Sequence, residues 1–447
     1  MSSSGLGSGV GDGAAVEVGV VVVGAGAAGL MAAIWAGRTF GGGARRGGGP
    51  GRVVVLDGAK KIGAKILVAG GGRCNVTHES VDERQYTGTS LHSIRNVLGR
   101  FTVEQTREFF AGLGVELKQE ATGKLFPVSD DAHTVLDALV GECERVGGEL
   151  VHPWRVVGIR RDEETRKFVV EGEVAGGGRE TIAARRVVMA TGGMALPRTG
   201  SDGAGYGLVR GLGHSVTGEV FPALVPLILS KSGVVGRELT SLSGLTLAAE
   251  LELWSGGGKR LRSFANSTLF THFGLSGPSV LDISRYYTAA KRQDAGAVLT
   301  LNVLPGVKAG VVEQALLSGG TKGVKAVLVG LEVAERLARS LITIAEIEAG
   351  ATCASLRREQ RLLLVRAVTA LPLPIEGDRG FTFAEVTAGG VPLSEVNLAT
   401  MESRVCPGLH LCGELLDVDG RVGGFNFQWA WASGYVAGVG AIRGCAE

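Results

Sequence analysis

The sequence lacks the long apolar segments that cross a bilayer, since none of its hydrophobic runs approaches the roughly 20 residues that a membrane helix needs. Its first 15 residues also lack a basic n-region and an Arg-rich amphipathic pattern, so they show no targeting signal. We therefore expect a cytoplasmic protein with no membrane partner.

Cysteine and histidine are few and scattered. The six cysteines form no CxxC pair, and the seven histidines show no HxH or HxxxH spacing. Because such spacings hold zinc in structural and catalytic sites, we predict no metal site. Isolated cysteines are typical of a reduced chain with free thiols, as in the cytosol.

An excess of one charge is missing as well. The chain has 46 Lys and Arg against 44 Asp and Glu, and no Lys/Arg run exceeds a pair. Proteins that bind nucleic acid usually carry a basic patch or stripe. We therefore expect a small-molecule substrate and no nucleic-acid partner, while nothing in the composition indicates an oligomeric state.

Glycine, by contrast, is abundant, at 73 of 447 residues. Part of it lies in low-complexity stretches, namely residues 1–15, which we expect to be a disordered tail, and 40–51, which we expect to be a flexible surface loop. Apolar residues make up 45% of the chain and charged residues 20%, which is typical of a globular protein. The length predicts two or three domains.

The first patterned segment is an apolar, β-branched run at Val18–Val23. A glycine turn and an Ala/Leu/Met-rich segment ending near Arg38 follow, and then a second buried strand at 52–56. This order predicts a βαβ unit, whose right-handed crossover makes the two strands parallel neighbours.

The composition shifts after about residue 205. Antiparallel-type strands are predicted to about residue 304, and helices from 306 to about 370. Strand-like sequence returns near 381–391, and the chain closes with a helix in which Trp429, Trp431 and Tyr435 stand at helical spacing, as core residues would. The pattern predicts an α/β domain interrupted by a long insertion that is partly β and partly helical.

Three glycines carry the clearest chemical signal. Gly24, Gly26 and Gly29 form G-x-G-x-x-G between the first strand and the first helix. In dinucleotide-binding folds the first glycine permits the tight turn, the second lets the backbone approach a pyrophosphate, and the third packs helix against strand. The helix N-terminus then faces the phosphates. Asp57, at the end of the second strand, suits the adenosine ribose, and the loop at 40–51 accounts for its late position.

Two later motifs narrow the class of nucleotide-binding protein. One is a strand that ends in ATGG at 190–193, and the other is a C-terminal strand that runs into GELLDVDGRVGGFN at 413–426. Together with G-x-G-x-x-G they match the three fingerprints of two-dinucleotide-binding-domain flavoproteins. More narrowly, the chain resembles the aminoacetone-oxidase-like or BaiN-like family of NAD(P)/FAD-dependent oxidoreductases. KILVAGGGRCNVTH, LFTHFGLSGPSVLDIS and AEVTAGGV also carry this resemblance, which covers nearly the whole chain from residue 18.

The resemblance implies an α/β fold with a Rossmann-like FAD-binding domain interrupted by a β-rich, barrel-like domain and a small helical domain. The expected discontinuous FAD-binding domain covers 16–200 and 404–447. The expected β-rich insert covers 201–304 and 376–403, and the expected helical domain covers 305–375.

The resemblance also implies FAD as the cofactor. The segment 24–29 would hold its pyrophosphate, Asp57 the ribose and Val156 the adenine, while the segment 70–75 would line the flavin. The expected cofactor-binding residues are Gly24, Ala25, Gly26, Ala27, Ala28, Gly29, Asp57, Gly58, Lys65, Gly70, Gly71, Gly72, Arg73, Cys74, Asn75, Val156, Ala190, Thr191, Gly192, Gly193, Gly413, Glu414, Gly424, Phe425 and Asn426.

Two residues are candidates for chemistry. His272, which the resemblance implies lies near the flavin ring, could protonate a substrate carbonyl or enone; the alternative is a histidine hydrogen-bonded at a domain interface. Cys74 follows a glycine run, as in flavin disulfide reductases. Position 79, where its redox partner would stand, is Glu, so we predict no redox-active disulfide. A lone thiol that modulates or reacts with the flavin stays open.

The resulting prediction is an FAD-dependent oxidoreductase that transfers hydride between flavin N5 and a small organic substrate. The family resemblance allows amine oxidation or enone reduction. Because no second strand-anchored G-x-G-x-x-G exists, any NAD(P)H would bind transiently as electron donor. The alternatives are a flavin-dependent RNA-modifying enzyme and a flavin-binding sensor without turnover.

Overall fold

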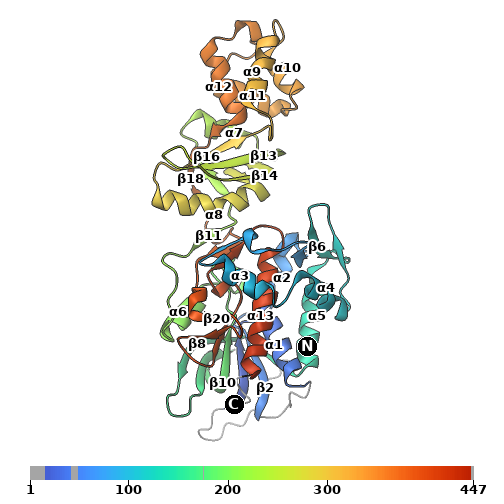
Figure 1. Ribbon diagram of the computed structural model, residues 1–447, viewed down its shortest axis with the longest axis vertical. Helices are drawn as coiled ribbons and strands as arrows, with labels where there is room; N and C mark the ends of the chain where they lie inside the picture. The colour runs from blue at the N-terminus through green and yellow to red at the C-terminus, as the bar shows by residue number, and fades with distance from the viewer. Residues whose placement is uncertain (1–15, 42–48, 175, 444–447) are drawn as a thin grey trace. The chain divides into compact units, whose positions relative to one another are not determined.

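The computed structural model describes residues 16–41, 49–174 and 176–443 (Figure 1). These residues form two compact units. Unit 1 contains the chain up to Phe221 and from Val386 onward, and unit 2 is Pro222–Glu385. The tail expected at 1–15 and most of the loop expected at 40–51 lie outside the described residues.

Unit 1 is built on a nine-stranded sheet. Its strands are β1 (Val16–Val23), β2 (Gly49–Leu56), β7 (Gly148–Val151), β8 (Trp154–Arg161), β9 (Phe168–Val174), β10 (Arg179–Met189), β20 (Val396–Asn397), β21 (Glu402–Ser403) and β22 (Leu409–Leu411). The order is β20-β21-β22-β10-β1-β2-β7, with β9 paired to β10 and β8 to β9. The strands from β22 to β7 are parallel. The predicted parallel neighbours β1 and β2 are thus confirmed.

The strand β1 is buried along almost its whole length, from Val18 to Val23. A parallel strand whose two faces are both covered reads as a continuous apolar run rather than as an alternating one. Its VVVV sequence is therefore typical of a central strand whose sheet is covered by helices.

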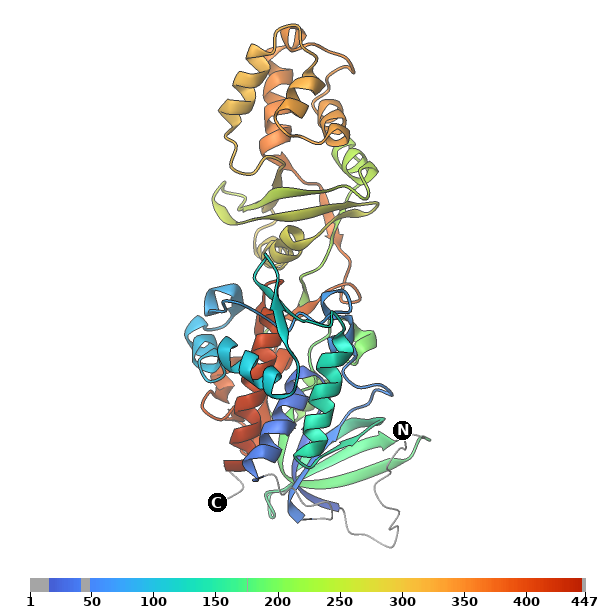
Figure 2. The same ribbon diagram turned by 90° about the vertical axis from the view of Figure 1, so that its right-hand side faces the viewer.

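Helices α1 (Ala27–Thr39) and α13 (Phe425–Arg443) lie side by side in unit 1, α1 in blue and α13 in red in Figures 1 and 2. A Cβ on Gly434 would lie 2.5 Å from the carbonyl oxygen of Ala28, and one on Gly438 would lie 2.2 Å from that of Ala32. The two helix backbones therefore touch, and a larger side chain at either glycine would force them apart. The other helices of unit 1 are α2 (Ala64–Val68), α3 (Leu91–Leu98), α4 (Val103–Gly112), α5 (Ala132–Arg145) and α6 (Ala204–Gly211).

The aromatic residues of α13 pack inward. Trp429 and Trp431 are 2% and 0% exposed, and their indole N–H groups donate to the carbonyl oxygens of Gly413 at 3.1 Å and Val76 at 2.8 Å. A buried indole needs such a partner. The prediction that these tryptophans belong to the core is confirmed, and both also fix backbone segments that matter below.

Short strands complete unit 1. They are β3 (Thr77–His78), β4 (Tyr86–Gly88), β5 (Leu117–Gln119), β6 (Lys124–Pro127), β19 (Val386–Ala388) and β23 (Val418–Gly420). β3, β6 and β5 form a small antiparallel sheet, and β4 pairs with β23. The second pairing ties residues 86–88 to the segment that leads into α13.

Unit 2 contains an antiparallel sheet of seven strands and a group of helices. Its elements are β12 (Leu227–Leu229), α7 (Val234–Ser241), β13 (Thr246–Trp254), β14 (Arg260–Thr271), β15 (Gly274–Ser276), α8 (Pro278–Gln293), β16 (Val298–Asn302), α9 (Ala309–Ser318), α10 (Val324–Gly330), α11 (Glu335–Ile344), α12 (Arg358–Thr369), β17 (Leu371–Pro372) and β18 (Ile375–Asp378). The antiparallel strands and the four helices from 309 to 369 agree with the predicted pattern.

The sheet of unit 2 runs β17-β16-β13-β14-β15-β12-β18. Its two end strands are neighbours in the chain, so the single segment 371–378 pairs with β16 at one end and with β12 at the other. This connection bends the sheet around its core in a barrel-like manner. Side chains from the sheet and from the four following helices share one hydrophobic cluster.

The unit boundaries differ from the expected domain boundaries. Residues 201–221 and 386–403, which we expected in the insert, belong to unit 1. For residues 396–403 the reason is backbone pairing: β21 pairs with β22, and β20 pairs with β21, so both join the large sheet. Two-residue strands carry no periodicity that sequence reading can detect. The structure also keeps the segment 305–375 in the same compact unit as the second sheet.

No helix within the described ranges combines the length and the apolar character that a bilayer span requires.

Candidate functional site

The glycine turn after β1 is shaped first by the protein's own backbone. Gly24 has φ = 103°, and a Cβ there would lie 2.5 Å from the carbonyl oxygen of Ala190, at the end of β10. A Cβ on Gly29 would lie 1.8 Å from the carbonyl oxygen of Gly24. Packing alone therefore requires these two glycines.

Gly26 is different. Its φ and ψ of −83° and −171° are extended values that any residue adopts, and a Cβ there would meet no atom within 4 Å. Neither conformation nor packing explains the absence of a side chain. The position directly precedes α1, whose first N–H groups have no side-chain cap. An open position at a helix N-terminus is what a pyrophosphate requires.

Asp57 fastens this turn to the end of β2. One carboxylate oxygen accepts a hydrogen bond from the backbone N–H of Ala25 at 2.7 Å, and the other accepts from that of Ala59 at 2.8 Å. Its carbonyl oxygen accepts from Trp154 N at 2.7 Å, which brings the start of β8, the strand of Val156, to the same place. Asp57 thus organises the turn in addition to any contact with a ribose.

The ATGG segment lies against both neighbouring strands. Ala190 N donates to the carbonyl oxygen of Val23 at 2.9 Å. A Cβ on Gly193 would lie 2.4 Å from Thr387 Oγ1 and 2.8 Å from a carboxylate oxygen of Glu414. Gly192 has φ = 71°, so glycine is also favoured there by conformation.

Thr387 was not predicted from the sequence, although it stands within the AEVTAGGV motif. Its Oγ1 accepts hydrogen bonds from Met194 N at 2.7 Å and Ala195 N at 3.0 Å, and its own N–H donates to Glu414 at 2.9 Å. This one residue joins the ATGG loop to the C-terminal motif. The sequence signal for Thr387 is a polar side chain within an otherwise apolar strand motif.

Lys65 and Glu414, both expected at the cofactor, form an ion pair of 2.5 Å with side chains 26% and 17% exposed. Gly413, with φ = 72°, donates its N–H to Ser433 Oγ at 3.0 Å and accepts the Trp429 indole N–H. The C-terminal motif is therefore held by α13 on one side and by the α2 segment on the other.

The segment 70–75 meets the start of α13. Its three glycines have φ of 59°, 71° and 87°. The Asn75 side-chain oxygen accepts from Gly424 N at 3.0 Å, and its NH₂ donates to the Thr77 carbonyl oxygen at 2.9 Å. Because a Cβ on Gly424 would lie 2.6 Å from the Thr77 backbone, this contact is close enough to require glycine. The Asn75 side chain therefore links the segment 70–75 to the start of α13.

Two residues of this segment have side chains engaged elsewhere. The Arg73 guanidinium donates to Glu120 at 2.6 Å and lies 4.0 Å from the Phe126 ring. Cys74 is 0% exposed, and burial raises the pKa of its thiol to about 12. A neutral thiol is a poor nucleophile at pH 7, which argues against a chemical role for Cys74. The cysteines within the described ranges are all free.

The first residues of α13 support their surroundings. Phe425 accepts a hydrogen bond at its carbonyl oxygen from the Tyr86 hydroxyl at 2.7 Å, and its ring stacks on His78 at 4.9 Å. The Asn426 side chain accepts from Gly420 N at 2.8 Å and donates to the Gly420 carbonyl oxygen at 2.9 Å. These contacts fix the turn between β23 and α13.

His272 stands in unit 2, in the turn between β14 and β15. Thr271 Oγ1 donates to the Gly274 carbonyl oxygen at 2.9 Å and accepts from Gly274 N at 3.1 Å, so the turn is closed. The imidazole is exposed, packs edge-on against the Phe273 ring at 5.2 Å and has no hydrogen-bond partner in the part of the chain that the structure describes.

The predicted cofactor segments of unit 1 therefore converge. The turns after β1, β2, β10 and β22 lie at the carboxyl ends of adjacent parallel strands, and the starts of α1 and α13 meet them. This edge is where open α/β sheets bind ligands. Within the described ranges no group of three or more His, Cys, Asp or Glu could hold a metal ion.

A sequence profile described as the HI0933-like protein Rossmann domain matches residues 18–440. The chain belongs to the HI0933-like family.

Curated relatives of this HI0933-like protein cover nearly its whole length. It is 35% identical to the 3-dehydro-bile acid delta(4,6)-reductase of Clostridium scindens, over 94% of this chain and 98% of the relative. It is 32% identical to the ribosomal RNA dihydrouridine synthase of Escherichia coli, over 93% and 96%.

Among solved structures, 3-ketosteroid delta1-dehydrogenase from Sterolibacterium denitrificans aligns with a TM-score of 0.50 at 12% identity, covering 95% of this chain and 100% of that one. This likeness concerns the fold, which is the mixed α/β flavoprotein type expected from the sequence. The family and its relatives together make this HI0933-like protein an oxidoreductase of the FAD-dependent class.

Proposed function

We propose that this HI0933-like protein reduces a carbon–carbon double bond conjugated to a carbonyl group, with FAD as its resident cofactor. The observation that carries the cofactor assignment is the open position at Gly26, where the protein itself gives no reason for glycine. The reductase relative at 35% identity supports the direction of the reaction.

The residues present fit FAD. The uncapped start of α1 and the open side of Gly26 suit the pyrophosphate, and Asp57 suits the ribose. The start of α13, with Gly424 and Phe425, directs its positive dipole end toward the converging turns, where it can stabilise negative charge on a reduced isoalloxazine. Bound FAD supplies the hydride carrier, and the chain supplies position and electrostatics.

The two curated relatives suggest one shared bond type. A 3-oxo steroid with double bonds at positions 4 and 6 is a conjugated enone, and dihydrouridine is uridine whose C5–C6 bond, conjugated to the C4 carbonyl, has been saturated. Both conversions add a hydride to the carbon remote from the carbonyl and a proton to the adjacent one. We propose that this protein performs the same addition on a small planar enone.

Reduction needs an electron donor, and we propose NADPH or NADH, bound transiently. Amine oxidation, which the aminoacetone-oxidase resemblance would imply, runs in the opposite electron direction and needs no such donor. The free, buried cysteines are typical of a reducing compartment and support a cytoplasmic location.

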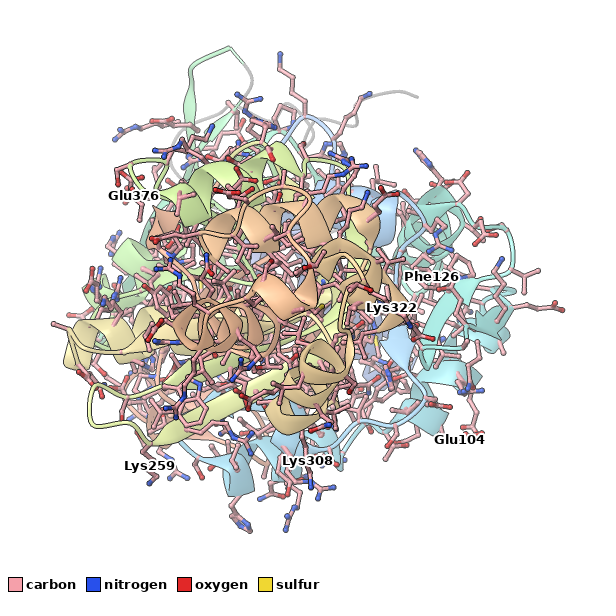
Figure 3. All side chains as sticks on the ribbon, turned by 90° about the horizontal axis from the view of Figure 1, so that it is seen from above. Glu104, Phe126, Lys259, Lys308, Lys322 and Glu376 are labelled. Atoms are coloured by element: carbon pink, nitrogen blue, oxygen red, sulfur yellow. The ribbon has the colours of Figure 1, made fainter. Side chains whose placement is uncertain are left out.

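Reduction of uracil in ribosomal RNA is a second candidate. It is supported by the Escherichia coli relative and by one from Haemophilus influenzae that is 30% identical over 95% of this chain. Residues 222–385 also contain 18 Lys and Arg against 14 Asp and Glu. Three exposed lysines of unit 2 are labelled in Figure 3, on separate loops: Lys259, Lys308 and Lys322.

The test is an anaerobic reductive titration of the purified protein with NADPH and NADH, followed by reoxidation with one acceptor at a time. A 4-ene-3-oxo steroid, a uridine-containing ribosomal RNA fragment and air are the acceptors, and aminoacetone is added separately to the oxidised protein. We expect flavin bleaching by a nicotinamide and fastest reoxidation by the enone.

Fastest reoxidation by RNA would favour the second candidate. Bleaching by the amine alone would replace both reductase proposals with oxidation. Purified protein that carries no FAD, or a flavin inert to every donor, would refute the proposed function.

A further inference from the structure

Lys65 and Glu414, which are 349 positions apart in the chain, meet in one ion pair inside unit 1. Their side chains are only 26% and 17% exposed. The helix that carries the lysine, α2, is fixed against α5, since a Cβ on Gly63 would lie 2.3 Å from the Leu136 side chain. Salt screens a partly buried pair of this kind less than it screens a surface pair.

The Glu414 carboxylate also has a structural task. Its other oxygen, Oε1, accepts the backbone N–H of Thr387 at 2.9 Å. Thr387 in turn accepts two backbone N–H groups of the segment that follows ATGG. This task needs an acceptor oxygen, which the amide of glutamine also offers. The negative charge of Glu414 is therefore not required by the hydrogen bond that it accepts.

The charge lies close to the start of α1. A Cβ on Gly413 would be 2.9 Å from the Cβ of Ala28, the second residue of that helix. On the other side, a Cβ on Gly193 would be 2.8 Å from Glu414 Oε1. The carboxylate thus stands between the ATGG segment and the helix start at which we place the pyrophosphate. A pyrophosphate diester carries two negative charges, so the Glu414 charge opposes its binding.

The other charges expected at the cofactor do not balance this carboxylate. The expected cofactor-binding residues include two acids, Asp57 and Glu414, and two bases, Lys65 and Arg73. Arg73 is paired with Glu120 at 2.6 Å. Asp57 accepts from the backbone N–H groups of two residues and brings no cation. Among these expected residues, Lys65 is therefore the cation that opposes the charge of Glu414.

We infer that Lys65 is a positioning residue, which neutralises Glu414 so that the dianionic pyrophosphate of FAD can bind at the neighbouring start of α1; this inference rests on FAD as the proposed cofactor. A partly buried carboxylate that loses its cation is destabilised and repels other anions. Removal of the lysine should therefore weaken FAD binding through Glu414, and removal of both charges should restore it.

The inference is tested with the full chain, stripped of FAD, as Lys65→Met, Glu414→Gln, the double variant and Lys61→Met. Lys61 is an exposed lysine four positions earlier, without an ion pair among the described residues, and serves as the matched control. FAD binding is titrated calorimetrically from about 10 mM to about 150 mM NaCl, over which the screening length falls from about 30 Å to about 8 Å.

At low salt we expect Lys65→Met to weaken FAD binding at least about 10-fold, and the double variant to recover most of this loss. Salt should reduce the defect of Lys65→Met, because it screens the repulsion. Glu414→Gln should bind FAD more tightly than the wild type at low salt and lose this gain as salt rises, because Lys65 then attracts the pyrophosphate. Lys61→Met should match the wild type within about 2-fold.

A merely structural pair would not give salt responses of opposite sign in the two single variants. Circular dichroism and urea denaturation report the folding of each protein. Should Lys65→Met misfold, Glu414→Gln, whose amide oxygen still accepts the Thr387 N–H, carries the test through its salt response.

A double variant that binds FAD as weakly as Lys65→Met would overturn the inference, since the lysine would then act by direct contact with FAD. Salt responses equal to that of the wild type in both single variants would overturn it as well. Either result would leave the proposed function intact. A wild-type protein that binds no FAD at any salt concentration would instead refute the proposed function.

Discussion

Residues 24–29 and 70–75 are both rich in glycine, yet an added Cβ would meet different surroundings in the two segments. At Gly24 and Gly29 it would strike backbone oxygen atoms, and at Gly26 it would meet nothing. At Gly71 it would also meet nothing, but there φ is 71°, a value that disfavours any side chain. Glycine is thus required for different reasons. Packing requires it at Gly24 and Gly29, the approach of a ligand requires it at Gly26, and backbone conformation requires it at Gly71.

This difference separates structural glycines from one that faces a ligand. Among the glycines of these two segments, only Gly26 combines an ordinary φ with empty space, so its substitution should spare the fold and harm binding. Gly29 should behave in the opposite way, and Gly71 should cost stability through strain. Three glycine substitutions test this division, and a fourth substitution, at Cys74, tests the buried thiol of the second segment; they follow from the largest expected effect to the smallest.

Gly29→Val should prevent stable folding. The new Cβ would lie 1.8 Å from the Gly24 carbonyl oxygen, and main-chain atoms cannot move aside as a flexible side chain can. We expect a loss of at least about 3 kcal/mol in the free energy of unfolding, measured by urea denaturation. Gly141→Ala, at an open position of α5, is the control and should not destabilise. A Gly29→Val protein with wild-type stability would refute the packing requirement.

Gly26→Val should abolish FAD retention while leaving the fold intact. The side chain would occupy the space assigned to the pyrophosphate, so we expect an affinity loss of roughly 100-fold or more, equivalent to about 2.7 kcal/mol. The free energy of unfolding of the apo-protein should change by no more than about 1 kcal/mol. Flavin absorbance and calorimetric titration measure the two effects. Undiminished flavin content would remove the cofactor from this turn.

Gly71→Ala should cost about 1–2 kcal/mol of stability, because a side chain at positive φ is strained even in open space. Gly71→Asn should lose less, since asparagine tolerates this conformation better. Both should still bind FAD. Loss of flavin without loss of stability would mean that Gly71 acts as Gly26 does.

Cys74→Ala should have the smallest effect at neutral pH and a visible one at alkaline pH. Burial raises the pKa of the folded thiol from 9.0 to about 12. Between these values the unfolded chain loses a proton that the folded chain keeps, so this cysteine lowers stability as pH rises. The variant should therefore denature less readily above pH 9. In the wild type, iodoacetamide at pH 8 should label Cys74 only after unfolding.

The sequence was sufficient for the parts of the fold that depend on long, regular patterns. The buried run of β1, the G-x-G-x-x-G turn and the apolar α13 follow from periodicity and from glycine spacing. The unit boundaries did not, because β20 and β21 are too short to show a pattern and are specified by pairing with distant strands.

The site divides in the same way. Its glycines and Asp57 were predictable as motifs, while the roles of Thr387 and Asn75 depend on contacts between segments far apart in sequence. The motif singles out Asn75 but does not predict its hydrogen bond with Gly424 N. A sequence pattern does not indicate which backbone group a buried amide side chain will bind.

Gly434 and Gly438 pack closely against Ala28 and Ala32, and this contact constrains the order in which the chain can fold during its synthesis. Helices α1 and α13 meet backbone to backbone, so α1 cannot reach its final packing until α13 has been synthesised. All of unit 2 is translated in the interval. We expect a chain truncated before α13 to form its first glycine turn but to retain no FAD.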